Sequence, residues 1–313
     1  MKMTYRPRPR TEKILRWTLE KVNSVPYDVP TRWAFYRVLQ EVPSALGQSI
    51  AKRDYSNFIK WTSRARRCFW EGWTPWTFCD DTREIIKLGE GFGSFGDWVK
   101  SFESERPTYE KFSSQKYIVT IWFEARAMIP QFVYYAAPYH IPLVPFGGDI
   151  GPDYKWRIAE FLTSLVERFP GKPVVVLYFG DYEPIRKTGS RGKGISIPLS
   201  ALSDIRPWFE MLQIERKLDP VDIHFERCGL NPEHIERWGL PDNPERPGEY
   251  QWESLGDEQA RELIVGAIER YWSHGAIEEV ERKEERDVER WMSVLRRIQA
   301  ELGQPAQGGE DGG

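Results

Sequence analysis

Acidic residues follow two apolar stretches of the chain that have the character of buried strands. Residues 174–179 (VVVLYF) and 117–123 (YIVTIWF) are runs of β-branched, aliphatic and aromatic side chains, as expected of strands covered on both faces of a parallel sheet. Asp181 and Glu183 follow the first run after a glycine, and Glu124 follows the second run directly. Ligands of open α/β sheets lie beyond the carboxyl ends of the strands. These three carboxylates are therefore predicted to hold Mg²⁺, with coordination positions left open for water and phosphate.

The same acids also have a simpler interpretation. Acids after buried strands often cap helices or form turns, and a lone Asp-x-Glu is more often structural than catalytic. The i, i+2 spacing in extended backbone directs Asp181 and Glu183 to the same side, and Pro184 prevents the strand from continuing. The choice between the two interpretations depends on the rest of the chain.

Basic residues are concentrated at the amino-terminal end of the chain. The net charge of the 313 residues is only −3, but residues 1–67 contain fifteen Lys and Arg against five Asp and Glu. This part therefore carries +10 and the remainder −13. Chance clustering on a solvated surface is the alternative, but so large a split favours binding of a polyanion, with nucleic acid as the best candidate.

Three helical segments and a short extended one make up this basic part. Apolar spacing predicts helices over residues 11–25, 31–42 and 55–70, with Thr11 as the cap of the first, followed by strand-like residues within 72–83. This order is that of a winged-helix domain, in which a basic helix lies along DNA, although an ordinary small helical domain is the alternative. The DNA-binding candidates lie on the third helix and on a later glycine-rich loop: Lys60, Arg64, Arg66, Arg67 and Lys193.

Strands alternate with helices from about residue 107, which implies a right-handed parallel sheet. Four strands are predicted, at residues 117–123, 140–146, 174–180 and 222–230. A literal Gly-x-Gly-x-x-Gly at Gly91, Gly93 and Gly96 follows a helical stretch instead of a strand, so we interpret it as a boundary loop. We expect a protein of mixed α+β and α/β class with two domains. Its parts are a basic arm (1–10), a winged-helix domain (11–106), a sheet domain (107–275), a charged helix (276–302) and a disordered tail (303–313).

The composition is that of a globular protein. Hydrophobic residues make up 40% and aromatic residues 14% of a chain long enough for two sizeable cores. Three cysteines and four histidines show no zinc spacing, and an odd cysteine count without a signal peptide predicts a cytoplasmic location. Residues 128–146 approach membrane-spanning length but contain four prolines. We therefore expect a soluble protein with no membrane partner.

Taken together, these segments resemble the A subunit of DNA topoisomerase VI and the related meiotic double-strand-break protein. The similarity runs from about residue 10 to 275 and is greatest to the compact, stand-alone A-subunit-like proteins of prokaryotes and mobile elements. Arg32-Trp33-Ala34-Phe35-Tyr36 resembles the family's Arg-x-x-Tyr-Tyr segment, and residues 80–83 resemble its Asp-x-Thr-Arg. Glu124, Asp181 and Glu183 match the family's Toprim signature. Residues 227–241 and 250–256 resemble two later segments, including the one written ELDAL.

The resemblance implies a type II DNA topoisomerase activity that cleaves and rejoins double-stranded DNA. In the family, a winged-helix (CAP-like) domain carries the nucleophilic tyrosine and a Toprim domain binds Mg²⁺. Carried over, Tyr36 is the nucleophile, Arg32 its neighbouring cation, and Glu124, Asp181 and Glu183 the ligands of Mg²⁺, or alternatively Mn²⁺. A homodimer is implied, in which the tyrosine of one subunit works with the metal of the other. A separate GHKL-type ATPase B subunit is a further expected partner, and the setting is the cytoplasm of a prokaryote, or a mobile element or virus.

Departures from the family pattern keep two other functions open. Glu183 replaces the usual second aspartate, the family's Asp-Pro-x-Gly reads Glu-Pro-Ile-Arg at residues 183–186, and the first acid of ELDAL is absent. One alternative is a metal-dependent Toprim nuclease that uses water, which would make Tyr36 dispensable. By spacing alone, Tyr36 is a core aromatic beside Phe35 on an amphipathic helix. The other alternative is a non-catalytic DNA-binding or assembly factor.

Overall fold

The computed structural model describes residues 5–42, 52–78, 94–183 and 197–303, apart from positions 104, 107, 108 and 149. The chain divides into two compact units. The first comprises Met1–Arg83 and Lys116–Trp272, and the second comprises Glu84–Gln115 and Ser273–Gly313. The amino-terminal helices and the sheet thus belong to the same unit. Among the described helices, none is both long and apolar enough to cross a membrane.

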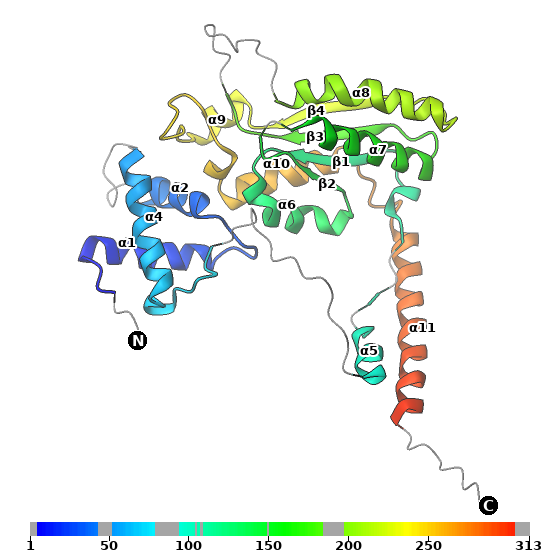
Figure 1. Ribbon diagram of the computed structural model, residues 1–313, viewed down its shortest axis with the longest axis horizontal. Helices are drawn as coiled ribbons and strands as arrows, with labels where there is room; N and C mark the ends of the chain where they lie inside the picture. Colours follow the sequence, from blue (N-terminus) through cyan, green and yellow to red (C-terminus); the bar gives the residue numbers. More distant parts are fainter. Residues whose placement is uncertain are drawn as a thin grey trace, which may run out of the picture. The chain divides into compact units, whose positions relative to one another are not determined.

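A four-stranded parallel sheet forms the centre of the first unit (Figure 1). Its strands are β1 (Ile118–Phe123), β2 (Leu143–Pro145), β3 (Val174–Phe179) and β4 (Ile223–Gly229), in the spatial order β2-β1-β3-β4. All residues of β1 and β3 are buried, which explains their unbroken apolar runs. The expected parallel sheet of an α/β protein is confirmed.

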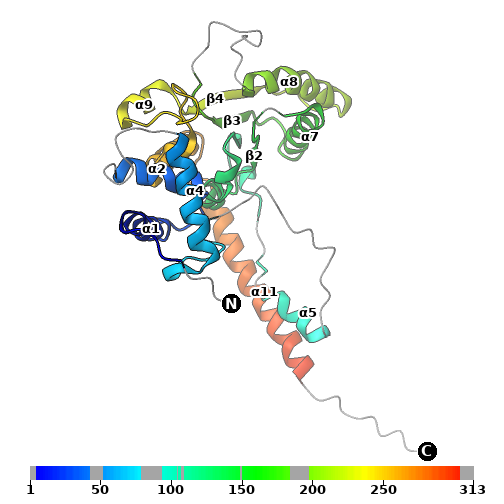
Figure 2. The ribbon, with the colours of Figure 1, turned by 60° about the vertical axis from the view of Figure 1, so that its left-hand side comes forward.

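Helices cover both faces of this sheet (Figures 1 and 2). The helices α7 (Pro152–Arg168) and α8 (Ile197–Glu215) pack together on one face, and α6 (Ile129–Ala136) and α10 (Asp257–Glu269) pack together on the other. α7 buries Ile158, Leu162 and Val166 on one stripe, as its 3.6-residue periodicity requires. A short helix, α9 (Pro232–Trp238), follows β4.

Three described helices precede the sheet in the first unit: α1 (Pro9–Val22), α2 (Thr31–Glu41) and α4 (Lys52–Arg67). α2 buries nearly all of its central residues, including Trp33, Phe35 and Tyr36. Phe35 contacts Phe58 of α4 at a ring-centroid distance of 5.6 Å. The aromatic run of α2 is therefore the core around which these helices pack.

Hydrogen bonds attach these helices to the sheet layer of the same unit. Arg37 of α2 donates to the carbonyl oxygen of Ser254, and Gln40 donates to the same oxygen at 3.0 Å. Tyr27, in the loop before α2, donates to Asp257 at 2.5 Å and accepts from Gln131 of α6 at 2.9 Å. Because these groups are half-buried or buried, losing their partners would be costly, and the two layers are held in a defined relation.

The second unit contains α5 (Phe95–Ser101) and the long α11 (Glu278–Gly303). Phe102, which follows α5, contacts Trp98 edge-to-face at 4.8 Å and Trp291 of α11 at 6.3 Å. Tyr109 donates a hydrogen bond to Asp287. The charged carboxyl-terminal helix was expected at 276–302 and is observed at 278–303.

Some local expectations were wrong. Thr11 does not cap α1: the helix begins at Pro9 after Arg8, because proline is well placed in the first helical turn, and Thr11 is buried within it. The described part of the segment expected to be extended, residues 72–78, forms turns instead of a strand, since Thr74 and Thr77 bond to each other. Residues 79–83, the Asp-x-Thr-Arg match included, lie outside the described residues, as do Gly91 and Gly93.

Candidate active site

The carboxyl ends of β1 and β3 lie side by side at the point where the strand order reverses. The chain leaves β1 towards β2 on one side and leaves β3 towards β4 on the other, and such a switch point is where open α/β sheets bind ligands. Phe123 pairs with Phe179 at the last rung of the two strands. Glu124 is the next residue on one strand, and Asp181 follows two residues after the end of the other. This register places the two acids at the same edge of the sheet.

Glu124 is held against the sheet by its own neighbours. Its amide nitrogen donates to the carbonyl oxygen of Phe179 at 3.0 Å, and its carboxylate accepts from the Tyr178 hydroxyl at 3.0 Å. Burial is the main cause that raises the pKa of Glu124, and the charge of Glu183 adds to it, while the Tyr178 hydrogen bond opposes the shift.

Asp181 is anchored by the backbone of a distant segment. Its Oδ1 accepts a hydrogen bond from the Trp252 amide at 2.8 Å. Arg227 of β4 donates to the Asp181 carbonyl oxygen at 2.7 Å. Burial raises the pKa of the Asp181 carboxyl well above its ordinary value, and the nearby charge of Glu253 raises it further.

Gly180, between β3 and Asp181, allows Tyr178 to reach Glu124. A Cβ atom at this position would lie 2.3 Å from the Tyr178 hydroxyl oxygen, far inside van der Waals contact. The ring of Tyr178 therefore occupies the space that any side chain at residue 180 would need. The glycine that interrupts the apolar run is required by this close approach.

Glu253 is an additional carboxylate at this site that the sequence prediction did not include. It is buried, and burial raises its pKa, while its own backbone amide and Arg32 oppose the shift. Among the charged groups that act on Asp181, it has the largest effect on the pKa. Burial thus raises the pKa values of three acidic side chains at this site, Glu124, Asp181 and Glu253.

This donor set has the chemistry that a hard divalent cation requires. A cation would stabilise the ionised form of carboxylates whose pKa is raised by burial, and oxygen ligands are those that Mg²⁺ prefers. Within the described residues, however, no three His, Cys, Asp or Glu side chains already surround a common point. Glu183 is exposed to solvent, whereas Asp181 and Glu124 are half-buried. The residues fit Mg²⁺ by type, and side-chain rotation would be needed to bring them to one point.

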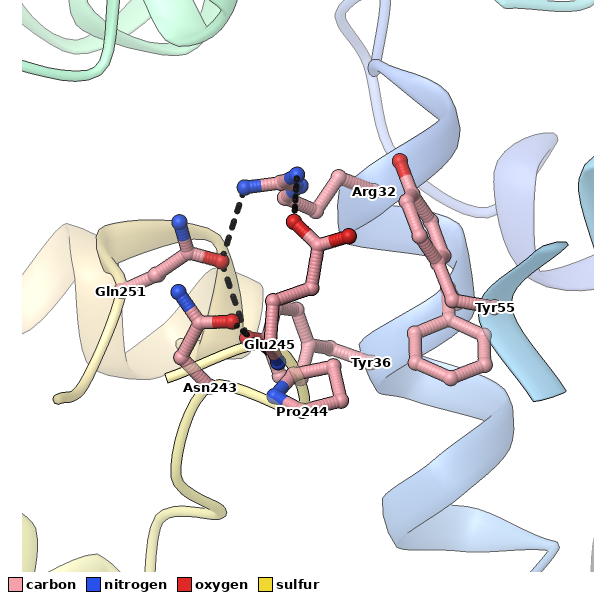
Figure 3. A pocket seen from close by; sticks show the side chains of 8 residues that line it. Arg32, Tyr36, Tyr55, Asn243, Pro244, Glu245 and Gln251 are labelled. Atoms are coloured by element: carbon pink, nitrogen blue, oxygen red, sulfur yellow. Dashed lines mark hydrogen bonds and ion pairs between the residues drawn. The ribbon is translucent and has the colours of Figure 1, made fainter. Parts of the chain in front are cut away.

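Tyr36 and Arg32 share one hydrogen-bond acceptor beside these acids (Figure 3). The Tyr36 hydroxyl and the Arg32 Nη1 each donate to Oε1 of Gln251 at 3.0 Å. The two donors lie one helical turn apart on α2, so their side chains reach the same point. Arg32 also lies 3.9 Å from the carboxylate of Glu245 and stacks over the ring of Tyr55 at 5.3 Å.

The buried setting of Tyr36 opposes its ionisation. Tyr36 is completely inaccessible to solvent. Burial is the main cause that raises the pKa of its hydroxyl, Glu253 adds to the shift, and Arg32 opposes it. A tyrosine in this state is a protonated hydrogen-bond donor, so use of Tyr36 as a nucleophile requires a change that exposes it and removes its proton.

Consecutive residues connect the tyrosine to the acids. Tyr250 forms an antiparallel bridge with Tyr182, with hydrogen bonds of 2.8 and 2.9 Å in the two directions. Gln251 receives Tyr36, and the amide of Trp252 donates to Asp181. The segment Tyr250–Trp252 therefore joins the helices and the carboxyl ends of the strands at a single place.

The DNA-binding candidates on α4 divide into two groups. Lys60, Arg64 and Arg67 are exposed and spaced i, i+4, i+7, which places them on one face. Arg66 is half-buried: its guanidinium donates to the carbonyl oxygens of Pro75 and Phe78. Its positive charge therefore stabilises a turn of the fold. Lys193 and the residues from 184 to 196 lie outside the described residues.

Comparison of the chain with protein-family models, with curated proteins and with solved structures returned no match. A function must therefore be inferred from the residues and their geometry.

Two residues of the site, Gln251 and Glu253, were not singled out from the sequence. The segment that contains them was noted for its similarity to the ELDAL segment, and that was the only signal. Tyr36 and Gln251 are 215 residues apart in the chain. Periodicity and local motifs carry no information on such a pairing, which arises only from the docking of α2 on the sheet layer.

Proposed function

We propose that this protein cleaves and rejoins DNA by tyrosine transesterification, as a topoisomerase VI A-subunit-like enzyme with a winged-helix-like helical part and a Toprim-like sheet. The observation that supports this most is the continuity of the site. Tyr36 and Arg32 bond to Gln251, and the next residue, Trp252, bonds to Asp181. These hydrogen bonds connect the proposed nucleophile and its neighbouring cation to a carboxylate at the strand ends, which supports the proposal.

The proposed step exchanges one phosphoester for another. The Tyr36 oxygen attacks a backbone phosphorus, the new bond is a 5′-phosphotyrosyl ester, and the bond to the 3′ oxygen breaks. The tyrosine proton passes to solvent water, and the departing 3′ oxygen takes up a proton from solvent to become a hydroxyl. Because the ester keeps the bond energy, the reverse attack rejoins the strand without a high-energy cofactor.

Positive charge is needed for this step because an ordinary tyrosine has a pKa of about 10. Arg32, one turn before Tyr36, supplies a permanent cation that opposes the raised pKa of the hydroxyl. Glu124, Asp181 and Glu183 would hold Mg²⁺, with Mn²⁺ as the alternative. When bound, the metal would supply charge stabilisation to the phosphate.

Double-stranded DNA is the proposed substrate, and the basic helix α4 supplies exposed cations for its backbone. A homodimer would provide one tyrosine for each strand. A GHKL-type ATPase partner and a cytoplasmic location in a prokaryote, mobile element or virus remain proposals that rest on the sequence resemblance.

The test uses supercoiled plasmid, Mg²⁺ or Mn²⁺, and a detergent stop. We expect linear or nicked DNA with covalently bound protein from the wild type and none from Tyr36→Phe or Asp181→Ala. Tyr139→Phe is the matched control, because its hydroxyl bonds to Glu269, away from the site. Absence of any cleavage with either metal would contradict the proposal and leave a DNA-binding or assembly role.

Hydrolysis by water is the second candidate, and the burial of Tyr36 favours it. A tyrosine that is inaccessible and has a raised pKa is poorly prepared for attack, whereas Glu183 is exposed. A metal-dependent nuclease would cut plasmid equally well in the Tyr36→Phe variant and would leave no protein on the DNA.

A further inference from the structure

An exposed aromatic pair follows the carboxyl-terminal end of the basic helix α4. The side chains of Phe69 and Trp76 are 59% and 72% exposed, and their rings meet edge-to-face at a centroid distance of 6.2 Å. Large apolar surfaces of this kind are costly in water, so a pair that is both exposed and ordered indicates a contact surface.

The turn that carries Trp76 is built to hold it in place. Arg66 donates to the carbonyl oxygens on both sides of this residue, at Pro75 and Phe78, and stacks over the ring of Phe78 at 5.4 Å. Thr74 and Thr77 close the turn with hydrogen bonds of 2.9 and 3.1 Å. The backbone that carries Trp76 is therefore held in place, which lowers the entropic cost of a contact.

Trp76 also borders an open hollow of mixed character. It is lined in part by Leu19, Val22, Asn23, Pro26, Asp28 and Trp76. The apolar members suit a flat ring, and the amide and carboxylate can bond to the edge of one. Such a combination of a stacking surface and a few polar groups is what holds an unstacked nucleobase.

The charge of the neighbouring helix favours nucleic acid over an apolar protein segment. Lys60, Arg64 and Arg67 form an exposed basic stripe, and it ends two residues before Phe69. Residues 1–67 carry a net charge of +10. A strand whose phosphates contact the stripe would bring a base to the aromatic pair.

We propose that Trp76, with Phe69, stacks on an unpaired base of the DNA whose backbone is bound along α4. The inference rests on the DNA binding in the proposed function and adds a preference for DNA with an unpaired base. It does not involve Tyr36 or the acids, so it can fail while cleavage stands.

The experiment compares fluorescence anisotropy of labelled duplexes with and without a single-base bulge. Wild type is expected to bind the bulged duplex more tightly, and Trp76→Ala is expected to lose that preference by about five- to hundredfold, the range for base–aromatic stacking. Trp76→Phe should recover part of it. Ile214→Ala is the control, because Ile214 is the most exposed large apolar side chain described and it lies on α8.

A second readout uses 2-aminopurine as the bulged base, because stacking changes its fluorescence. Quenching by wild type that is lost in Trp76→Ala would support the stacking contact. Equal affinity of wild type for both duplexes, or an equal loss on both in Trp76→Ala, would overturn the inference and leave the proposed function intact. No binding of wild type to either duplex would overturn both.

Discussion

Gln251 is the residue on which the geometry of the site depends most. Its single side-chain oxygen accepts hydrogen bonds from both Tyr36 and Arg32. An alanine at residue 251 would leave the buried Tyr36 hydroxyl and the half-buried Arg32 guanidinium without that acceptor, and hydrogen bonds of this kind contribute about 0.5–3 kcal/mol each. The role we assign to Gln251 is to position the other two, and it is not itself a reacting group.

We predict that Gln251→Ala lowers the rate of adduct formation at saturating DNA by about tenfold or more. The affinity for DNA should remain close to that of the wild type, because the basic face of α4 is unchanged. Gln40→Ala is the control, since it removes a glutamine that bonds to Ser254 at the same interface. Equal losses in the rate of adduct formation in the two variants would contradict the positioning role and leave Gln251 a structural one.

Asp181 carries a second prediction, on the pH dependence of stability. Its pKa is raised in the folded protein, chiefly by burial, so the folded state binds this proton more tightly than the unfolded chain. The contribution of this proton to the free energy of unfolding is fully present below pH about 4, the ordinary pKa of aspartate in the unfolded chain. It is lost as the pH rises through the raised pKa of the folded protein. At neutral pH, the cost of burying the Asp181 carboxyl therefore destabilises the protein when no metal is bound.

Asp181→Asn should accordingly raise the melting temperature at pH 7 without metal, and the gain should shrink towards pH 4. Asparagine keeps an oxygen that can accept from the Trp252 amide, so the fold is preserved. In thermal melts, Mg²⁺ should stabilise the wild type more than the variant. A variant less stable than the wild type at pH 7 in metal-free buffer would contradict this interpretation.

The carboxyl end of β3 depends on the close approach of the Tyr178 ring to Gly180. Gly180→Ala places a methyl group against the tyrosine hydroxyl, and such overpacking costs about 1–3 kcal/mol. We expect this loss in denaturant unfolding, together with weaker metal-dependent stabilisation because Tyr178 bonds to Glu124. Gly266→Ala is the control: apart from the backbone of its own helix and its chain neighbours, no atom lies within 4 Å of its added Cβ, and a helix-interior alanine should stabilise by about 1 kcal/mol.

The strands of the sheet were the part of the fold that the sequence predicted best. β1 and β3 were placed to within one residue because an unbroken apolar run of this length, bounded by polar residues and glycine, is typical of a strand buried on both faces. β2 is shorter than expected, at Leu143–Pro145 instead of residues 140–146, because Pro142 precedes it and Pro145 ends it, and neither can donate to the ladder. Thr11 was misplaced because Pro9, at the first helical position, starts α1 two residues before it.

Only some residues of the candidate site could be predicted from the sequence, for a physical reason. Acids at the ends of adjacent parallel strands meet because the sheet topology brings them together. The partner of Tyr36 depends on how α2 docks on a layer more than 200 residues away, and the sequence contains no local trace of that contact. For the same reason Arg66 was expected on DNA, although it bonds to the turn at Pro75.

Within the first unit as a whole, Tyr36 lies beside acids of its own chain. The resemblance had implied that the tyrosine of one subunit works with the metal of another. Here Gln251 and Trp252 connect Tyr36 to Asp181 within one chain, and the hydrogen bonds of Tyr27, Arg37 and Gln40 secure the same docking. This arrangement favours a site completed by a single chain.

A mixing experiment distinguishes the two arrangements. Tyr36→Phe and Asp181→Ala proteins are each expected to be inactive. If each site is built within one chain, a mixture that has been allowed to exchange subunits will remain inactive, and we predict this result. Adduct formation that recovers on mixing would show that a second chain supplies one of the two groups.

Mass spectrometry can identify the residue to which the DNA is covalently linked. Covalent complexes formed with Mg²⁺ are digested with nuclease and trypsin, and the peptides are analysed for added nucleotide mass. Trypsin should release residues 33–37, because Arg32 and Arg37 flank this stretch. We predict a nucleotide on Tyr36 of that peptide, linked through a 5′ phosphate. Cleaved DNA with residues 33–37 unmodified would contradict the nucleophilic role of Tyr36.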